Sequence, residues 1–313
     1  MMEKRFALGL DFGGTKLAAG VIDLSEPCLV DSAFRSTRRS EGAEGAVVDM
    51  IDLASGLQHI DSIDRIGICY GGYAANNRVL KSLHVPGWDA FPLGERLQDH
   101  FGSLPVYLAN DANAVGLGEY RFGAGRGARS MMFITVSTGV GGGVILDGHL
   151  WEGEHGLSGE IGHTRVVNEG ALKCDCGRYG CVETVCSGPS MAGRARTLLA
   201  EKPEVPSLLR DTPNFTAREV DQCAAQGDSI AVQVVKESAG YLGVAIGNAI
   251  QLFDLDCVVI GGGVSRSGAL WWETLRASVE ASTLPWRPPV AIKPSALGTH
   301  EGIWGAVALL PQD

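Results

Sequence analysis

The chain has 313 residues, of which 45% are hydrophobic and 20% are charged, a mixture typical of a globular protein with one large or two medium domains. Its net charge of −10 argues against a nucleic-acid partner, because binding a phosphate backbone needs a basic face. Residues 1–10 turn polar too soon for a signal peptide, and no apolar run approaches the roughly 20 residues that span a bilayer. We therefore expect a cytoplasmic protein without a membrane partner.

The 43 glycines gather in short runs, which indicates backbone turns close to a ligand. The first run is Asp11-Phe12-Gly13-Gly14-Thr15-Lys16, between predicted strands at residues 6–10 and 17–22. A hairpin tip of this kind offers backbone N–H groups, a hydroxyl and an ammonium group to an anion. It is not a Walker A loop, because the GxxxxGK[ST] spacing is absent and a strand follows. An ordinary hairpin turn is the alternative.

A second copy of this pattern lies farther along the chain. The predicted strand at residues 131–136 leads into Ser137-Thr138-Gly139 and three more glycines, and a strand at residues 144–146 follows. Two such units suggest an internal duplication, with one phosphate-binding hairpin in each half facing the other across a cleft. A third run, Gly261-Gly262-Gly263, follows a strand at residues 257–260 and precedes a helix from residue 268, a junction that can admit a base or ribose.

Other elements follow from hydrophobic spacing. Strands are predicted at residues 63–70 and 106–109, and helices at residues 43–57, 112–120, 190–200, 229–252 and 302–309. A loop is expected at residues 203–213.

Asp111 is the candidate catalytic residue. It directly follows the strand at residues 106–109, and ligand-facing residues of open α/β folds lie at that end of a strand. Phosphoryl transfer to an alcohol needs a carboxylate that orients the hydroxyl and accepts its proton. The alternative is that Asp111 caps the helix that follows. Asn110 and Asn113 add polar groups suited to vicinal hydroxyls.

Three cysteines, Cys174, Cys176 and Cys181, fall within eight positions, and His163 is the nearest upstream histidine. Three thiolates and one imidazole complete the tetrahedral shell of zinc. A disulfide and buried free cysteines are the alternatives, although clustered cysteines in the cytoplasm favour a metal. Cys186 lies outside this spacing and is left unassigned.

Two glutamates accompany this cluster. Glu160 lies three residues before His163, and Glu183 lies two residues after Cys181. A zinc-bound loop would hold both carboxylates and the imidazole rigidly on one wall of a cleft, where they could bind sugar hydroxyls. Solvated surface charges are the alternative.

Together these motifs resemble the ROK family of sugar kinases and sugar-responsive repressors, and the resemblance covers nearly the whole chain. The most specific part is Glu-x-Gly-His from Glu160 combined with Cys-x-Cys-Gly-x-x-Gly-Cys-x-Glu from Cys174. The resemblance implies an α/β protein with the duplicated, actin-like (ribonuclease H-like) ATPase fold. It further implies a small domain at residues 1–117 with the C-terminal helix at 299–313, and a large domain at 118–298 that carries the zinc site.

The resemblance also implies roles for these residues. Asp111 would be the general base, and the sugar would be held by Asn110, Asp111, Glu160, His163 and Glu183. Zinc would be bound by His163, Cys174, Cys176 and Cys181. The ATP phosphates would be surrounded by Gly13, Gly14, Thr15, Lys16, Thr138 and Gly139, with Asp11 near Mg²⁺ and Gly261, Gly262 and Gly263 beside the adenosine.

The function implied is an ATP-dependent hexose kinase acting on the 6-hydroxyl, with glucose as the first candidate substrate. N-acetylmannosamine, N-acetylglucosamine, mannose, fructose and allose are alternatives, because the loop at residues 71–77 lacks the family's Pro-Gly-Pro-Val-Asp-like sequence. A sugar-sensing transcriptional regulator is a less favoured alternative, because the first hairpin begins within a dozen residues of Met1. The family also implies a homodimer or homotetramer.

Overall fold

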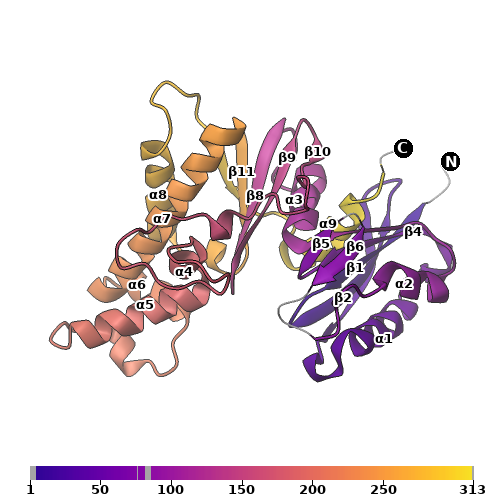
Figure 1. The fold of residues 1–313 in the computed structure, drawn as a ribbon, viewed down its shortest axis with the longest axis horizontal. Helices are drawn as coiled ribbons and strands as arrows, with labels where there is room; N and C mark the ends of the chain where they lie inside the picture. Colours follow the sequence, from indigo (N-terminus) through magenta and orange to yellow (C-terminus); the bar gives the residue numbers. More distant parts are fainter. Residues whose placement is uncertain (1–4, 76, 82–85, 312–313) are drawn as a thin grey trace. The chain divides into compact units, whose positions relative to one another are not determined.

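The computed structural model describes residues 5–75, 77–81 and 86–311, so Asn76 of the predicted sugar loop lies outside the described residues. The chain divides into two compact units (Figure 1). Unit 1 comprises residues 1–127, 143–158 and 295–313, and unit 2 comprises residues 128–142 and 159–294. The functional domain boundaries after residues 117 and 298 stay a prediction.

The sheet of unit 1 has the strand order β3-β2-β1-β4-β7. Its strands are β1 (Phe6–Phe12), β2 (Lys16–Asp23), β3 (Cys28–Ser36), β4 (Ile63–Tyr70) and β7 (Val106–Asn110). The first three strands are antiparallel neighbours, whereas β1, β4 and β7 run parallel. The short strands β5 (Tyr73–Ala75) and β6 (Arg78–Lys81) form a separate two-stranded sheet.

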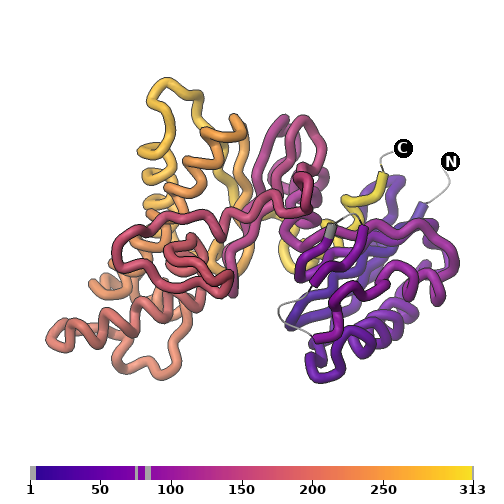
Figure 2. Tube along the Cα trace, in the orientation of Figure 1, coloured from indigo at the N-terminus to yellow at the C-terminus, as the bar shows by residue number. Residues whose placement is uncertain are grey.

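Alternate residues of β1 belong to two different cores, as the twofold period of a strand requires. Leu8 and Leu10 share a core with residues of α1 (Gly42–Ser55) and α2 (Leu93–Phe101). Ala7 instead packs with Ile303 and Val307 of α9 (Glu301–Ala308). The trace in Figure 2 shows the yellow C-terminal helix beside the indigo N-terminal strands. The C-terminal segment therefore completes the core begun by the first strand.

Glycines let α9 approach both the sheet and α3 (Asp111–Phe122). A Cβ atom at Gly67 of β4 would lie 2.0 Å from the Ala306 carbonyl oxygen, and one at Gly305 would lie 2.7 Å from the backbone of α3. Both distances are far shorter than any real contact, so only glycine fits at these crossings. This packing fixes the helix that begins with Asp111.

The second sheet has the order β10-β9-β8-β11-β12, the same arrangement as the first. Its strands are β8 (Ser130–Val136), β9 (Val140–Leu146), β10 (His149–Leu150), β11 (Cys257–Gly261) and β12 (Ala291–Pro294). As in the first sheet, an antiparallel pair lies at one side, and β8, β11 and β12 run parallel at the other. The two matching sheets confirm the predicted duplicated α/β fold.

Unit 2 contains the strands β8, β11 and β12 of this sheet together with several helices. The helices are α4 (Glu183–Cys186), α5 (Gly188–Glu201), α6 (Ala217–Ala225), α7 (Ser229–Phe253) and α8 (Ala269–Ala281). Close approach of α7 and α8 depends on small residues, because a Cβ atom at Gly243 would lie 2.5 Å from Cβ of Ser278. In the described part of the chain, no helix combines the length and the apolar character needed to cross a membrane.

Most predicted strands and helices agree with the structure to within three residues, and the strand at residues 63–70 matches β4 (Ile63–Tyr70) at both ends. Among the described residues, the helices α2, α4 and α6 and the strands β3, β5, β6, β10 and β12 were not predicted. β3 lies at a sheet edge and is half-buried along its length, so its apolar and polar residues lack a clear period. The expected loop at residues 203–213 contains a short 3₁₀ helix, Leu208–Asp211.

Candidate active site

The first glycine run forms the predicted hairpin tip in unit 1. β1 ends at Phe12 and β2 begins at Lys16, which leaves Gly13, Gly14 and Thr15 as the turn. A Cβ atom at Gly13 would lie 2.7 Å from the Lys16 carbonyl oxygen, so this turn requires glycine. The Lys16 ammonium lies at the same tip and donates to the Thr299 carbonyl oxygen at 3.3 Å. The tip thus combines backbone amides with a cation.

The parallel register brings residues distant in sequence to one edge of this sheet. Phe12 is the register partner of Tyr70, and Tyr70 is the partner of Asn110. The hairpin tip, the start of the loop after β4 and the start of α3 therefore all lie beyond the carboxyl ends of parallel strands. Open α/β sheets bind ligands at such edges.

Asp11 lies one residue before this edge and is half-buried. Loss of water around its carboxyl group is the main reason that the pKa of Asp11 is raised to about 7, and the nearby Asp111 carboxylate acts in the same direction. Lys16 acts in the opposite direction and lowers this pKa. Glu301, at the start of α9, is another carboxylate close enough to raise it. Such concentrated negative charge favours the binding of a cation.

Asn110, not Asp111, is the N-cap of α3. Its Oδ1 accepts hydrogen bonds from the backbone N–H groups of Ala112 (2.9 Å) and Asn113 (3.4 Å), and its Nδ2 donates to the Gly72 carbonyl oxygen at 2.9 Å. Asp111 occupies the first helical turn with an exposed side chain. The cap is therefore supplied by its neighbour, and the Asp111 carboxylate is presented to solvent at the sheet edge.

The second glycine run forms the corresponding turn in unit 2. Thr138 is exposed, and the Ser137 carbonyl oxygen accepts a hydrogen bond from the Gly188 N–H at 2.8 Å, where α5 begins. Gly262 lies against the end of β8, because a Cβ atom there would approach the Val136 carbonyl oxygen to 2.4 Å. Its φ of +83° is also a conformation that glycine tolerates best. The turn at Thr138 and the glycines at 261–263 are thus neighbours within unit 2.

Glu183 joins this turn to the cysteine-rich loop. Its Oε2 accepts a hydrogen bond from the Val140 N–H at 2.9 Å. Its Oε1 lies 3.9 Å from Sγ of Cys174. A Cβ atom at Gly139 would lie 2.6 Å from Oε2, so the glycine leaves room for this carboxylate. Two motifs that the sequence separates by about 40 positions therefore meet at one side chain.

The four predicted zinc ligands converge in unit 2. The ligand atoms of His163, Cys174, Cys176 and Cys181 all lie within 4.8 Å of one another. Nδ1 of His163 is 3.6 Å from Sγ of Cys174, and the Cys176 and Cys181 sulfurs are 3.7 Å apart. Bonds of about 2.3 Å to sulfur and about 2.0–2.1 Å to nitrogen would put tetrahedral ligand atoms about 3.5–3.8 Å apart. The donor set and its spacing fit zinc.

The other ring nitrogen of His163 faces a carboxylate. Nε2 lies 3.8 Å from Oε2 of Glu160, so the ring presents one nitrogen to the sulfurs and the other to the predicted sugar-binding glutamate. Among the thiols, the backbone N–H of Arg178 lowers the pKa of Cys176, whereas burial raises that of Cys174 to about 12. A zinc ion would displace the protons of these thiols, because the thiolate is the ligand. Cys186 does not join the cluster and donates to the Ser238 carbonyl oxygen at 3.3 Å.

Sequence reasoning did not find every residue around these groups. Glu301 and Cys69 both influence Asp11, and Thr37 and Arg39 hydrogen-bond to the hairpin, yet none belongs to a recognisable motif. Cys69 reaches the site from β4 and Glu301 from α9, whereas Thr37 and Arg39 come from the segment that follows β3. Glu301 directly precedes Gly302, where a Cβ atom would lie 2.3 Å from the Asp11 carboxylate.

Comparison with known proteins identifies the family. The sequence profile described as "ROK family" matches residues 7–313. A glucokinase of Halalkalibacterium halodurans is 34% identical over 323 aligned positions, covering 99% of this chain and 96% of that protein. An N-acetylmannosamine kinase of Yersinia pseudotuberculosis is 35% identical over 301 positions, covering 96% of each.

A solved structure agrees with these sequence relatives. The ROK family glucokinase of Streptomyces griseus, in complex with glucose and AMPPNP, superposes with a TM-score of 0.81 at 34% identity, covering 97% of this chain and 98% of that one. On this evidence the chain belongs to the ROK family.

Proposed function

We propose that this protein is an ATP-dependent hexose kinase that transfers the γ-phosphoryl group of ATP to the 6-hydroxyl of glucose. The observation that carries the proposal is the near-full-length similarity to a glucokinase whose structure holds glucose and AMPPNP. Phosphoryl transfer requires a carboxylate beside the attacking hydroxyl and donors around the phosphates, and the acidic sheet edge and the two glycine turns offer these groups.

Asp111 is the proposed general base. Its exposed carboxylate begins α3 at the carboxyl edge of the sheet, where it could accept the hydroxyl proton as the oxygen attacks the γ-phosphorus. The bond between the γ-phosphorus and the bridging oxygen then breaks, and ADP leaves. Asn110, Glu160, His163 and Glu183 are the proposed sugar ligands, since amide, imidazole and carboxylate groups all hydrogen-bond hydroxyls.

ATP is the proposed phosphoryl donor. Gly13, Gly14, Thr15 and Lys16 offer amides and an ammonium group to its phosphates, and Thr138 and Gly139 offer a second turn. Mg²⁺ bound to ATP would neutralise charge on the transferring group, and Asp11 is the carboxylate proposed to lie near it. Gly261, Gly262 and Gly263 are the proposed neighbours of adenosine.

Zinc is the proposed structural metal. His163, Cys174, Cys176 and Cys181 would hold it, and it would supply a rigid cross-link and no redox chemistry. Its proposed effect is to fix the ring of His163 and, through the adjoining chain, the carboxylate of Glu183. The cytoplasmic location and the homodimer or homotetramer stay predictions.

N-acetylmannosamine is the second candidate substrate, favoured by the 35% identical kinase for that sugar. The deciding experiment measures ADP formation by the purified protein with glucose, mannose, fructose, allose, N-acetylglucosamine and N-acetylmannosamine, and compares kcat/KM. We expect the highest kcat/KM with glucose. A higher value for an N-acetylhexosamine would reassign the substrate, and no ADP formation with any of the six sugars would contradict a kinase and favour a sugar sensor.

A further inference from the structure

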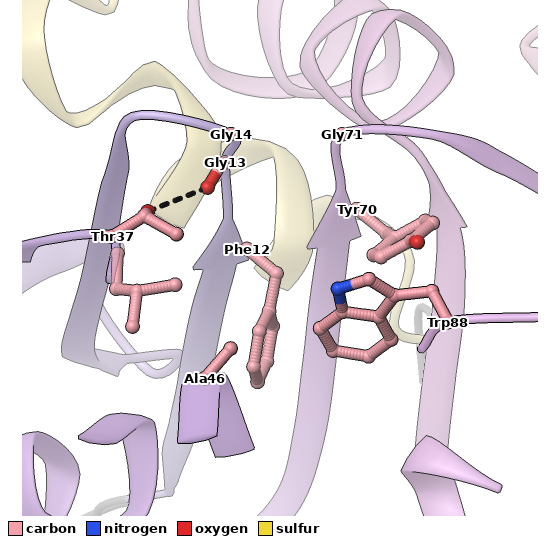
Figure 3. Close-up of a pocket in the computed structure, with 9 residues that line it drawn as sticks. Phe12, Gly13, Gly14, Thr37, Ala46, Tyr70, Gly71 and Trp88 are labelled. Carbon is pink, nitrogen blue, oxygen red and sulfur yellow. Dashed lines mark hydrogen bonds between the residues drawn. The ribbon is translucent and has the colours of Figure 1, made fainter. Parts of the chain in front are cut away.

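The carbonyl groups of the first glycine hairpin are all engaged from one side. Oγ1 of Thr37 donates to the Gly13 carbonyl oxygen at 2.7 Å, a contact drawn in Figure 3. Nε of Arg39 donates to the Gly14 carbonyl oxygen at 2.7 Å. The backbone N–H of Thr37 donates to the Thr15 carbonyl oxygen at 3.0 Å. Three consecutive carbonyls thus have donors from a segment outside the hairpin.

The carbonyls on either side are satisfied as well. The Phe12 carbonyl oxygen accepts from the Gly71 N–H at 2.9 Å, and the Lys16 carbonyl oxygen accepts from the Gly13 N–H at 3.0 Å. In contrast, within the described part of the chain, the N–H groups of Gly14 and Thr15 donate to no protein acceptor. The hairpin therefore turns its acceptors toward the protein and leaves donors for a ligand.

The segment that supplies these donors is itself anchored to α1. Thr37 directly follows β3, and Arg35 and Arg38 on either side of it both reach Asp49, a buried residue of α1. Nη1 of Arg35 lies 2.9 Å from Oδ1 of Asp49, and Nε of Arg38 lies 2.8 Å from Oδ2. These ion pairs lower the pKa of Asp49, so its charge persists at neutral pH. The backbone at Thr37 is thus held in place from both sides.

We propose that Thr37 and Arg39 are positioning residues for ATP, because they hold the Gly13 and Gly14 carbonyls inward and so keep the Gly14 and Thr15 amides directed at its phosphates. This inference rests on the proposed function of the hairpin. An anion bound by a turn needs all nearby carbonyl dipoles directed away from it. A turn freed from these bonds could rotate a peptide plane and present an oxygen to the phosphates.

Two substitutions remove the donors with little change of shape. Thr37→Val deletes the hydroxyl and keeps the branched side chain, while Thr37→Ser retains the hydroxyl and serves as the rescue. Arg39→Met removes the guanidinium that donates to the Gly14 carbonyl oxygen. Because Arg39 is exposed, this variant should fold and can test the positioning role even if Thr37→Val does not fold. Arg126→Met is the matched control, because Arg126 is exposed in the same unit and no described contact joins its side chain to the hairpin.

The measurement is the affinity for ATP and for adenosine by calorimetry with Mg²⁺ present, together with KM for ATP and for the sugar. A hydrogen bond contributes about 0.5–1.5 kcal/mol, so we expect Thr37→Val and Arg39→Met each to weaken ATP binding about 3–10-fold. Adenosine affinity, the KM for sugar and Tm should stay near wild type, and Thr37→Ser should restore ATP affinity. A purely structural role would lower Tm and affect both substrates.

ATP binding by Lys16→Ala tests separately whether the hairpin binds phosphate at all, independently of the positioning role of Thr37 and Arg39. If Lys16→Ala weakens ATP binding but Thr37→Val and Arg39→Met do not, the hairpin binds phosphate and the positioning role is wrong. If Lys16→Ala also leaves ATP affinity unchanged, the hairpin is not the phosphate site and both proposals fail. Equal weakening of ATP and adenosine by Thr37→Val would likewise overturn the positioning role.

Discussion

The N–H of Val140 donates a 2.9 Å hydrogen bond to the carboxylate of Glu183, and this bond ties the second glycine turn to the cysteine-rich loop. The other oxygen of the same carboxylate lies 3.9 Å from the Cys174 sulfur. A side chain proposed to hold sugar therefore also supports a turn proposed to hold phosphate. Its two roles can be separated by substitution.

Glu183→Gln keeps an oxygen that can accept from Val140, whereas Glu183→Ala removes the acceptor. We expect Glu183→Gln to raise the KM for sugar with little effect on the KM for ATP. Glu183→Ala should raise both by at least tenfold, because a lost hydrogen bond to a charged group costs about 1.5–3 kcal/mol. Steady-state kinetics with each substrate varied in turn provides the check. An unchanged KM for ATP in Glu183→Ala would show that the Val140 contact does not support the turn.

Asp111→Asn should lower kcat about 10²–10⁴-fold, the usual contribution of a general base. The variant should fold normally, because Asn110 supplies the cap of α3. Tm and kcat are to be measured beside Asp61→Asn, a substitution of an exposed aspartate away from the sheet edge. Near-wild-type turnover by Asp111→Asn would exclude Asp111 as the base.

Cys176→Ser should release zinc, because a serine hydroxyl is a poor substitute for a thiolate ligand. Metal analysis of the purified protein should give about one zinc per chain for wild type and a small fraction of that for the variant. Cys28→Ser is the control, since Cys28 is exposed and lies outside the cluster. Active wild-type protein free of zinc would refute the metal site.

Asp11→Asn should stabilise the protein while impairing catalysis. The pKa of Asp11 is raised from 3.8 to about 7 in the folded state, so the folded protein holds this proton more tightly than the unfolded chain. Stability is therefore lost as pH rises from about 4 to about 7, and the loss persists above that range. Without Mg²⁺ or ATP, the variant should exceed wild type by about 1–4 kcal/mol at pH 8.

The same comparison at low pH supplies its own control. Near pH 4 the carboxyl group is protonated in the folded protein, so wild type and Asp11→Asn should have almost equal unfolding free energies. Chemical denaturation at pH 4 and pH 8 measures both differences. An equal difference at the two pH values would show that the charge of Asp11 is not the destabilising factor.

Much of the site was predictable because its motifs are local. A strand followed by Gly13 and Gly14 and then another strand specifies a tight hairpin, since a Cβ atom at Gly13 would clash with the Lys16 carbonyl. Three cysteines in eight residues can reach one metal ion without help from distant segments, and the structure brings them together with His163. Asp111 was likewise predictable as a residue at a strand end.

Only the tertiary structure decided which groups support these motifs. Thr37 reaches the hairpin from the edge of the sheet, Glu301 reaches Asp11 from the C-terminal helix, and Val140 at the start of β9 meets Glu183 at the start of α4. The N-cap of α3 is Asn110, whose side chain caps the helix and also donates to the Gly72 carbonyl oxygen. Such contacts depend on strand register and helix packing across long sequence separations, and they leave no periodic signal in the sequence. The sequence alone therefore determined the chemistry of the site, and the packing of distant segments determined how each group is held.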